Sequence, residues 1–213
     1  MSDDIFPPIT LESDDIIAWS EDIQISYLYE AYKKGIFPWP HSPNEIIPWF
    51  CPQKRAILHF DDLHVSKSLK KFLKKSTYEF CINTAFEDVI NACAATPRKD
   101  ERGTWIDQRI KDSFIEFHYL GYAYSFETWE NDKLIGGLYG VFIDGHFSGE
   151  SMFHRKDNAS KFALINTIET LKEYGVSWID IQQLTPLFEQ FGAKEITRNE
   201  FLRLLKKENN TSK

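Results

Sequence analysis

The chain has 213 residues, of which 42% are apolar and 15% aromatic, and its formal net charge is −7. These proportions exclude a disordered or fibrous protein, and no apolar run reaches the ~20 residues that a membrane-spanning helix needs. The acidic first residues do not have the pattern of a secretory signal, so the sequence predicts a soluble, cytoplasmic protein with no membrane partner.

The N-terminal part is predicted to be a small domain, residues 1–55. Residues 1–12 look irregular, residues 23–34 have the pattern of a helix, and Gly35 is a plausible C-terminal cap. Residues 36–52 are rich in proline and lack a helical period, which predicts a rigid loop. Its large aromatics form either a local core or a stacking platform for a base. They are Phe37, Trp39, Trp49 and Phe50.

A lysine-rich segment, HVSKSLKKFLKK, follows at residues 64–75 and contains no acid. In a helix most of these lysines cluster on one side, while apolar residues face the core. Such a stripe can grip phosphates, but a charge run is more often only a solvated helix face. The lysines are Lys67, Lys70, Lys71, Lys74 and Lys75.

Residues 56–213 are predicted to form an α+β domain with a mostly antiparallel sheet. Strands are expected at residues 56–60, 78–82, 122–129, 133–143, 146–153 and 176–182. Helices are expected at residues 85–94, 106–120, 158–174, 184–191 and 198–207, and a charged loop at residues 97–103. Turn residues Asn131-Asp132 and Asp144-Gly145 predict that the third, fourth and fifth strands form a meander.

Polar residues interrupt two of these apolar strands. Strand alternation places Asp180 and Gln182 on one face, with Ile179 and Ile181 on the other. Glu150 interrupts a neighbouring strand in the same way. Because a buried carboxylate needs either partners or a task, the sequence predicts a polar site among these strands.

The cysteines and histidines give no sign of a disulfide framework or a metal site. Three cysteines form no C-x-x-C pair, and six histidines form no H-x-x-x-H pair. We therefore expect neither a metal nor a cofactor.

Nine segments resemble, in order, the leucyl/phenylalanyl-tRNA–protein transferases of bacteria. They are AYKKGIFPW (31–39), PWFCPQKRAIL (48–58), HVSKSLKK (64–71), TWI (104–106), LIGGLYGV (134–141), GESMF (149–153), NASK (158–161), IDIQ (179–182) and FGAKEI (191–196). The resemblance implies transfer of an amino acid, Leu, Phe or Met, from aminoacyl-tRNA to the N-terminal Arg or Lys of a protein, which marks that protein for proteolysis. It also implies a monomer whose larger domain is acetyltransferase-like (GNAT-like).

The resemblance further assigns roles to residues. Trp39 and Trp105 match aromatics that contact the terminal adenosine of the tRNA, and the lysines match a basic surface that tracks the acceptor stem. Residues that match the pocket for the donor side chain are Leu138, Phe147, Met152, Thr167 and Ile179.

The polar centre of the family is matched by Glu150, Asp180 and Gln182. The reaction is aminolysis of an ester, and the attacking amine must be neutral. We expect Asp180, directly or through Gln182, to deprotonate that amine. The alternative is that these residues only orient the substrates, since orientation alone can supply most of the rate.

The chain departs from the family pattern at Tyr124, His154, Thr167, Leu187 and Gln190. These departures leave donor and acceptor specificity open, and Thr167 in place of an aromatic predicts a roomier or more polar pocket. Two other functions have less support in the sequence. An acetyl-CoA-dependent N-acetyltransferase lacks support because no pyrophosphate-binding loop opens a helix, and an inactive RNA-binding module has little need of the retained acids.

Overall fold

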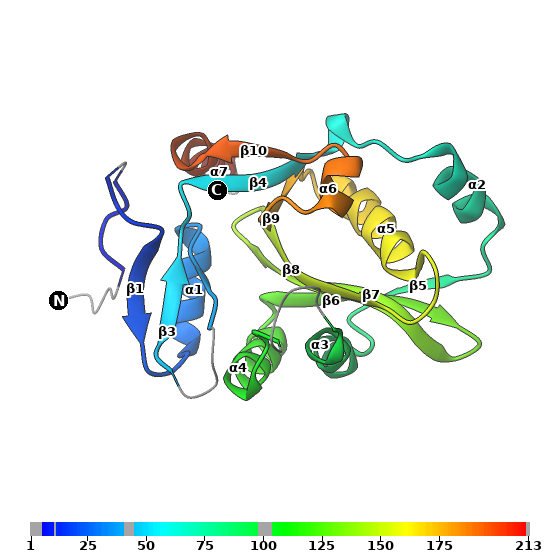
Figure 1. Ribbon diagram of the computed structural model, residues 1–213, viewed down its shortest axis with the longest axis horizontal. Helices are drawn as coiled ribbons and strands as arrows, with labels where there is room; N and C mark the ends of the chain where they lie inside the picture. Colours follow the sequence, from blue (N-terminus) through cyan, green and yellow to red (C-terminus); the bar gives the residue numbers. More distant parts are fainter. Residues whose placement is uncertain (1–5, 11, 41–44, 98–103, 212–213) are drawn as a thin grey trace.

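Two β-sheets of unequal size organise the chain, with helices on both sides of the larger one (Figure 1). The computed structural model describes residues 6–10, 12–40, 45–97 and 104–211, with side chains up to residue 206; the predicted charged loop lies outside these residues except at its first position. The smaller sheet has the strand order β1-β3-β2 and the larger one β10-β4-β9-β8-β7-β6-β5. The predicted α+β class is confirmed.

The strands are β1 (Ile16–Ser20), β2 (Phe37–Pro38), β3 (Ile47–Phe50), β4 (Lys54–His59), β5 (Glu79–Ile82), β6 (Ala123–Glu130), β7 (Lys133–Ile143), β8 (His146–His154), β9 (Trp178–Gln182) and β10 (Lys194–Thr197). The helices are α1 (Ile25–Lys33), α2 (Lys67–Lys75), α3 (Phe86–Ala95), α4 (Gln108–Tyr119), α5 (Ala159–Glu173), α6 (Pro186–Gln190) and α7 (Arg198–Thr211), with a short 3-10 helix, η1 (Phe60–Asp62).

The larger sheet owes its regular half to local signals. Strands β5 to β8 form an antiparallel meander, and the β6–β7 turn uses Asn131 and Asp132 at φ 49° and 58°. Asn and Asp tolerate this left-handed backbone, which matches the twist of a tight hairpin. Helices α3 and α4 cover one face of this meander, and α5 covers the other (Figure 1).

The N-terminal part corrects the prediction of a loop at residues 36–52. Two short strands, β2 and β3, lie in this segment, and β3 pairs with both β1 and β2. Pro38 and Pro48 lack N–H groups but still offer carbonyls, and Trp39 donates its backbone N–H to the Pro48 carbonyl at 3.0 Å. The pairing partner β1 is distant in the sequence, so local periodicity could not reveal this sheet.

The apolar core runs without interruption from the N-terminal part into the larger sheet. Leu28 and Trp49 belong to the same buried cluster as Ile90, Phe114 and Tyr139. Strand β4 begins at Lys54 and already belongs to the larger sheet. The shared core marks no boundary between the two parts. The predicted division of the chain between residues 55 and 56 therefore stays a prediction.

Strands β8 and β9 diverge, and this opens the middle of the sheet. They are the parallel pair of the sheet and meet in register at Ser148 and Asp180. Each strand also carries a bulge just beyond this point. In β8, Glu150 is the extra residue between Gly149 and Ser151, and in β9, Ile181 is the extra residue between Asp180 and Gln182. Bulges re-aim side chains, so this is where the alternation of the strands changes.

Candidate functional site

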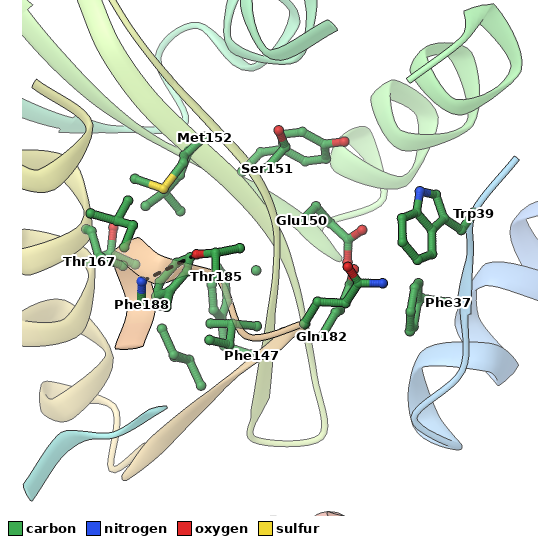
Figure 2. Close-up of a pocket in the computed structure, with 18 of the residues that line it drawn as sticks. Phe37, Trp39, Phe147, Glu150, Ser151, Met152, Thr167, Gln182, Thr185 and Phe188 are labelled. Atoms are coloured by element: carbon green, nitrogen blue, oxygen red, sulfur yellow. Dashed lines mark hydrogen bonds between the residues drawn. The ribbon is translucent and has the colours of Figure 1, made fainter. Parts of the chain in front are cut away.

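A cavity of about 340 Å³ occupies the gap between the diverging strands. Its walls come from β8, β9, α5 and α6 on one side and from the segment around β2 on the other. Figure 2 shows its residues in a row, with Phe37 and Trp39 at one end, Glu150 and Gln182 in the middle, and Met152, Thr167 and Phe188 at the other end.

The aromatic end of the cavity brings Trp39 and Trp105 together from distant parts of the sequence. Both indoles are half-buried. Phe37 lies beside Trp39, with ring centroids 6.4 Å apart, and Phe50 supports Trp39 edge-on at 5.6 Å. Trp49, in contrast, is fully buried in the core and donates its indole N–H to Ser20. The proline-rich segment thus supplies both a local core and a wall of the cavity.

The apolar end contains every residue predicted for the donor pocket. Thr167 is buried, and its hydroxyl donates a 2.8 Å hydrogen bond to the Ala163 carbonyl within α5. The threonine therefore adds no unsatisfied polar group to this end. Leu164, Leu187 and Phe188 complete this end with further apolar surface. The five predicted residues are Leu138, Phe147, Met152, Thr167 and Ile179.

The polar centre joins the two ends. Glu150 and Gln182 both line the cavity, and the Gln182 amide nitrogen donates to Glu150 Oε1 at 2.9 Å. Gln182 ends β9 with a left-handed backbone, φ 62°. This conformation is uncommon for a residue other than glycine, and such backbones concentrate at functional sites.

The structure corrects the predicted orientation of Asp180. We expected it to share a face with Gln182, but the cavity is lined by Ile179, Ile181 and Gln182 and not by Asp180. The bulge at Ile181 breaks the alternation and turns Gln182 into the cavity. Asp180 is 0% exposed. It is therefore not placed to take a proton directly from a substrate amine, and it contacts the cavity-lining Gln182 by accepting its backbone N–H at 2.9 Å.

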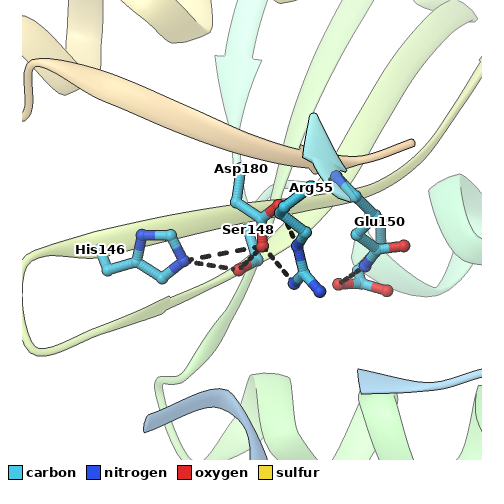
Figure 3. A network of polar contacts seen from close by, with 6 residues as sticks. Arg55, His146, Ser148, Glu150 and Asp180 are labelled. Carbon is cyan, nitrogen blue, oxygen red and sulfur yellow. Dashed lines mark hydrogen bonds and ion pairs between the residues drawn. The ribbon is translucent and has the colours of Figure 1, made fainter. Parts of the chain in front are cut away.

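Arg55 is the residue that sequence reasoning missed. Its guanidinium donates to both oxygens of Asp180, from Nε to Oδ1 at 2.7 Å and from Nη2 to Oδ2 at 2.6 Å. Figure 3 shows this pair beside His146, Ser148 and Glu150. The sequence does contain a sign that Arg55 is important. It is an arginine at the start of an apolar strand, inside a segment that matches the family.

The surroundings move the pKa values of the two acids in opposite directions. Burial by itself would raise the pKa of Asp180, but the charge and hydrogen bonds of Arg55 outweigh it and hold that pKa below its usual range. For Glu150, burial raises the pKa to about 7, and the nearby Tyr32 hydroxyl and the hydrogen bond from Gln182 partly offset this rise. Glu150 exposes part of its surface to the cavity, but its Oε2 is shielded from solvent. Glu150 thus changes its charge near neutral pH.

The predicted lysine stripe lies on α2, at the end of the molecule opposite the N-terminal part (Figure 1). All five lysines are exposed, while Leu69 is buried against the larger sheet. Ser66 caps the helix by accepting the backbone N–H of Leu69 at 3.3 Å. The lysines do not line the cavity, and their role in binding tRNA stays a prediction.

The five departures from the family pattern are scattered. Thr167 and Leu187 line the cavity. Tyr124 lines a separate apolar cavity of about 170 Å³ behind Phe147, and its hydroxyl donates to the Gly121 carbonyl. His154 is exposed at the end of β8, and Gln190 lies at the end of α6. Of the five departures, only those at positions 167 and 187 therefore change the lining of the main cavity.

The part of the chain that the structure describes contains neither a metal-binding cluster nor a membrane-spanning helix. No three metal-binding side chains gather in one place within the described ranges. Among the helices in that same part of the chain, none has the length and apolarity to cross a membrane.

Sequence comparisons identify the relatives of this chain. A family profile described as "Leucyl/phenylalanyl-tRNA protein transferase" matches residues 57–206, and the N-terminal domain of the same family matches residues 21–53. A leucyl/phenylalanyl-tRNA–protein transferase from Lawsonia intracellularis is 43% identical over 92% of this chain and 86% of its own length. One from Shewanella baltica is 45% identical over 89% of this chain and 79% of its own length.

Likeness to solved structures is weaker. A functionally unknown protein from Staphylococcus epidermidis has a TM-score of 0.45 at 10% identity, over 85% of this chain and 68% of its own. The C-terminal domain of a lysylphosphatidylglycerol synthetase from Agrobacterium fabrum, described as putative, has a TM-score of 0.42 at 11% identity, over 62% of this chain and 46% of its own. Similarity at this level supports no conclusion about this protein.

Proposed function

Because the chain belongs to the leucyl/phenylalanyl-tRNA protein transferase family, we propose that its cavity binds the aminoacylated 3′ end of a tRNA and delivers Leu, Phe or Met to an N-terminal Arg or Lys. Family membership makes the protein an aminoacyltransferase that uses aminoacyl-tRNA as donor and a protein N-terminus as acceptor. The choice of Met, of Arg or Lys acceptors, and of individual site residues is our proposal.

One observation carries the proposal, which is the order of surfaces along the cavity. Aromatic side chains, a polar centre and an apolar pocket follow one another in one continuous space (Figure 2). An aminoacyl-adenosine presents an aromatic base, a polar ester and a side chain in the same order. Trp39 and Trp105 suit stacking on the base, which typically contributes about 1–3 kcal/mol per stacked base.

Leucine, phenylalanine and methionine side chains suit the apolar end. Its walls are mostly aliphatic or aromatic; the Thr167 hydroxyl is satisfied inside α5, and the Thr185 hydroxyl accepts the backbone N–H of Phe188. Such a pocket selects by size and apolarity, and one methylene is worth about 1–3 kcal/mol. A polar or charged donor side chain would lose its hydration there without gaining a partner.

The chemistry is the attack of the acceptor α-amine on the ester carbonyl carbon. A C–N bond forms, the bond from carbonyl carbon to the 3′ oxygen breaks, and the proton released by the amine finally resides on that oxygen. We assign Glu150 to hold this proton in transit, because its pKa of about 7 is close to that of an α-amine. The Gln182 amide nitrogen faces Glu150, so its carbonyl oxygen is the end that accepts a hydrogen bond from the amine.

A basic acceptor residue is supported by the charge of the cavity. Glu150 is the one charged residue among the described side chains that line it. Asp180, the other acid of the polar centre, is neutralised by Arg55. An arginine or lysine at the acceptor N-terminus therefore meets a negative field when Glu150 is ionised.

The remaining expectations extend this proposal. The larger sheet, with helices on both faces and strands that diverge at the site, supports an acetyltransferase-like arrangement. A cytoplasmic monomer fits a substrate as large as a charged tRNA, which needs open access to α2.

A transfer assay with matched donors and acceptors tests the proposal. Purified protein is given Leu-, Phe-, Met- or Asp-tRNA and peptides that begin with Arg, Lys or Ala, and peptide mass is measured. We expect transfer from the three apolar donors to Arg and Lys peptides. Acetyl-CoA as donor gives no product. Transfer from Asp-tRNA at a similar rate, or to the Ala peptide, contradicts the proposed specificity.

Tryptophan variants link the assay to the cavity. Trp39→Ala is expected to raise the KM for the donor about 5- to 100-fold through lost stacking. Trp19→Ala is the matched control, because this indole is 54% exposed on β1 and lies outside the cavity. If the two variants raise the KM for the donor equally, the adenosine does not bind at the aromatic end.

A further inference from the structure

Arg55 lies where three parts of the fold meet. It belongs to β4, the strand that joins the N-terminal part to the larger sheet, and only 1% of its surface is exposed. Its bidentate pair with Asp180 fixes the guanidinium against β9 (Figure 3). A buried charge without such a partner would be strongly unfavourable.

Aromatic rings hold the guanidinium from two further elements. The Phe37 ring from β2 and the Phe201 ring from α7 each lie 4.6 Å from Arg55 Cζ. Phe37 also lines the cavity and lies beside Trp39. Arg55 is therefore in direct contact with the wall that forms the aromatic end of the cavity.

A chain of hydrogen bonds leads from Arg55 to the polar centre. Asp180 Oδ1 accepts both Arg55 Nε and the backbone N–H of Gln182, the latter at 2.9 Å. The Gln182 side chain then donates to Glu150. The bond from the Gln182 backbone to Asp180 holds the left-handed turn that directs Gln182 into the cavity.

We propose that Arg55 is a positioning residue that keeps the aromatic end and the polar centre of the cavity in one fixed alignment, so that an ester bound at Trp39 meets Gln182 and Glu150. This inference rests on the proposed function. A planar guanidinium can form a bidentate pair and stack between two rings at once, whereas a lysine ammonium cannot. A misplacement of about 1 Å in such a site can reduce the rate 100-fold.

The test compares Arg55→Lys with Arg198→Lys at saturating donor tRNA and acceptor peptide. Arg198 is the matched control, because it is also buried, at 3% exposed, but its guanidinium binds the carbonyls of Thr10, Ser13 and Asp14 outside the cavity. We expect kcat of Arg55→Lys to fall about 10- to 100-fold with the KM for the donor within about 3-fold. Arg198→Lys lowers Tm with kcat near that of the unchanged protein.

The pH profile gives a second readout. Glu150 is faced by Tyr32 from α1, Gln182 and Asp180 from β9, and Arg55 from β4. Arg55→Lys keeps the positive charge, so kcat should fall at low pH over the same pH range as in the unchanged protein. Arg55→Met removes a charge that lowers the pKa of Glu150, so this fall moves to higher pH. A purely structural loss lowers the folded fraction and does not change the pH range of the fall.

The outcomes separate this inference from the proposed function. If the unchanged protein transfers nothing, the proposed function fails. If it does transfer and Arg55→Lys has the same kcat, the inference is overturned. Should Arg55→Lys not fold, Phe201→Leu replaces it, because it loosens one stacking face without touching the cavity. A fall in kcat with unchanged KM then supports the inference, and an unchanged kcat overturns it.

Discussion

Charged side chains gather in two regions of this protein that differ in their exposure. At the polar centre, Arg55 and Asp180 are 1% and 0% exposed and are fixed by a bidentate pair. On α2, the lysines project into solvent. Buried charges act at short range in a poorly polarisable medium, whereas exposed ones are screened by water and salt. If the proposed function holds, the first region sets geometry and proton affinity, and the second sets attraction to the tRNA.

The largest expected effect comes from breaking the buried pair. Asp180→Ala leaves Arg55 buried without a counter-charge and should lower the free energy of unfolding by about 3–5 kcal/mol. Transfer by the folded fraction should be abolished, because Gln182 loses the acceptor of its backbone N–H. Denaturant unfolding and the transfer assay measure the two effects.

An exposed ion pair gives the control for this prediction. Asp62 pairs with Lys194 at 2.9 Å, and its side chain is 43% exposed. Asp62→Ala should leave the free energy of unfolding almost unchanged, because water and salt screen an exposed pair. If the two alanine variants lose the same stability, the contrast between buried and exposed charge does not hold in this protein.

Glu150→Gln should separate activity from stability. We expect kcat to fall about 100-fold or more through loss of the proton acceptor. The pKa of Glu150 in the folded protein, about 7, lies above its ordinary value of 4.5, so the folded state binds the extra proton between these values and stability falls as pH rises from 4.5 to 7. Removing the ionisable group should therefore raise the free energy of unfolding at pH 8 by about 1–3 kcal/mol.

Unfolding measured at pH 5 and pH 8 checks this sign. Glu189→Gln is the control, because Glu189 is exposed on the nearby helix α6. It should leave both the pH dependence of stability and kcat unchanged. A stability gain for Glu150→Gln that is the same at pH 5 as at pH 8 would contradict the raised pKa.

The smallest effect is expected on α2. The double variant Lys70→Ala/Lys71→Ala should weaken tRNA binding several-fold and leave kcat unchanged. Each lost phosphate contact reduces the slope of log Kd against log salt by about 0.7–0.9. Binding measured at several salt concentrations checks this, and Lys172→Ala/Lys206→Ala gives the same change of net charge elsewhere. If the Lys70→Ala/Lys71→Ala variant has an unchanged slope, the lysine stripe does not contact the tRNA.

Local patterns in the sequence were sufficient for most elements. Strand β7 (Lys133–Ile143) lies where an apolar run between turn residues predicted it, and α2 has the exposed lysines and buried Leu69 that its spacing predicted. Helix α1 is followed by Gly35 at φ 72°. Such signals depend on residues close together in the chain, so they can be read without tertiary structure.

The polar centre depended on the tertiary structure. The bulges at Glu150 and Ile181 exist only because β7 and β4 pair with β8 and β9 in a particular register. Alternation read from residues 176–182 alone gave the wrong partner for Gln182. Likewise, Arg55 and Asp180 lie far apart in the sequence, and only strand pairing brings them within hydrogen-bonding distance.

The sequence by itself determined the family, the order of the elements and which residue types would meet a charged, aromatic and apolar substrate. The tertiary structure decided which acid lines the cavity and which is sealed behind it. The physical reason is that burial and pairing set the charge state of a carboxyl group, and both are properties of contacts between distant segments. Asp180 and Glu150 carry similar groups, but only Glu150 lines the cavity with a pKa near neutrality.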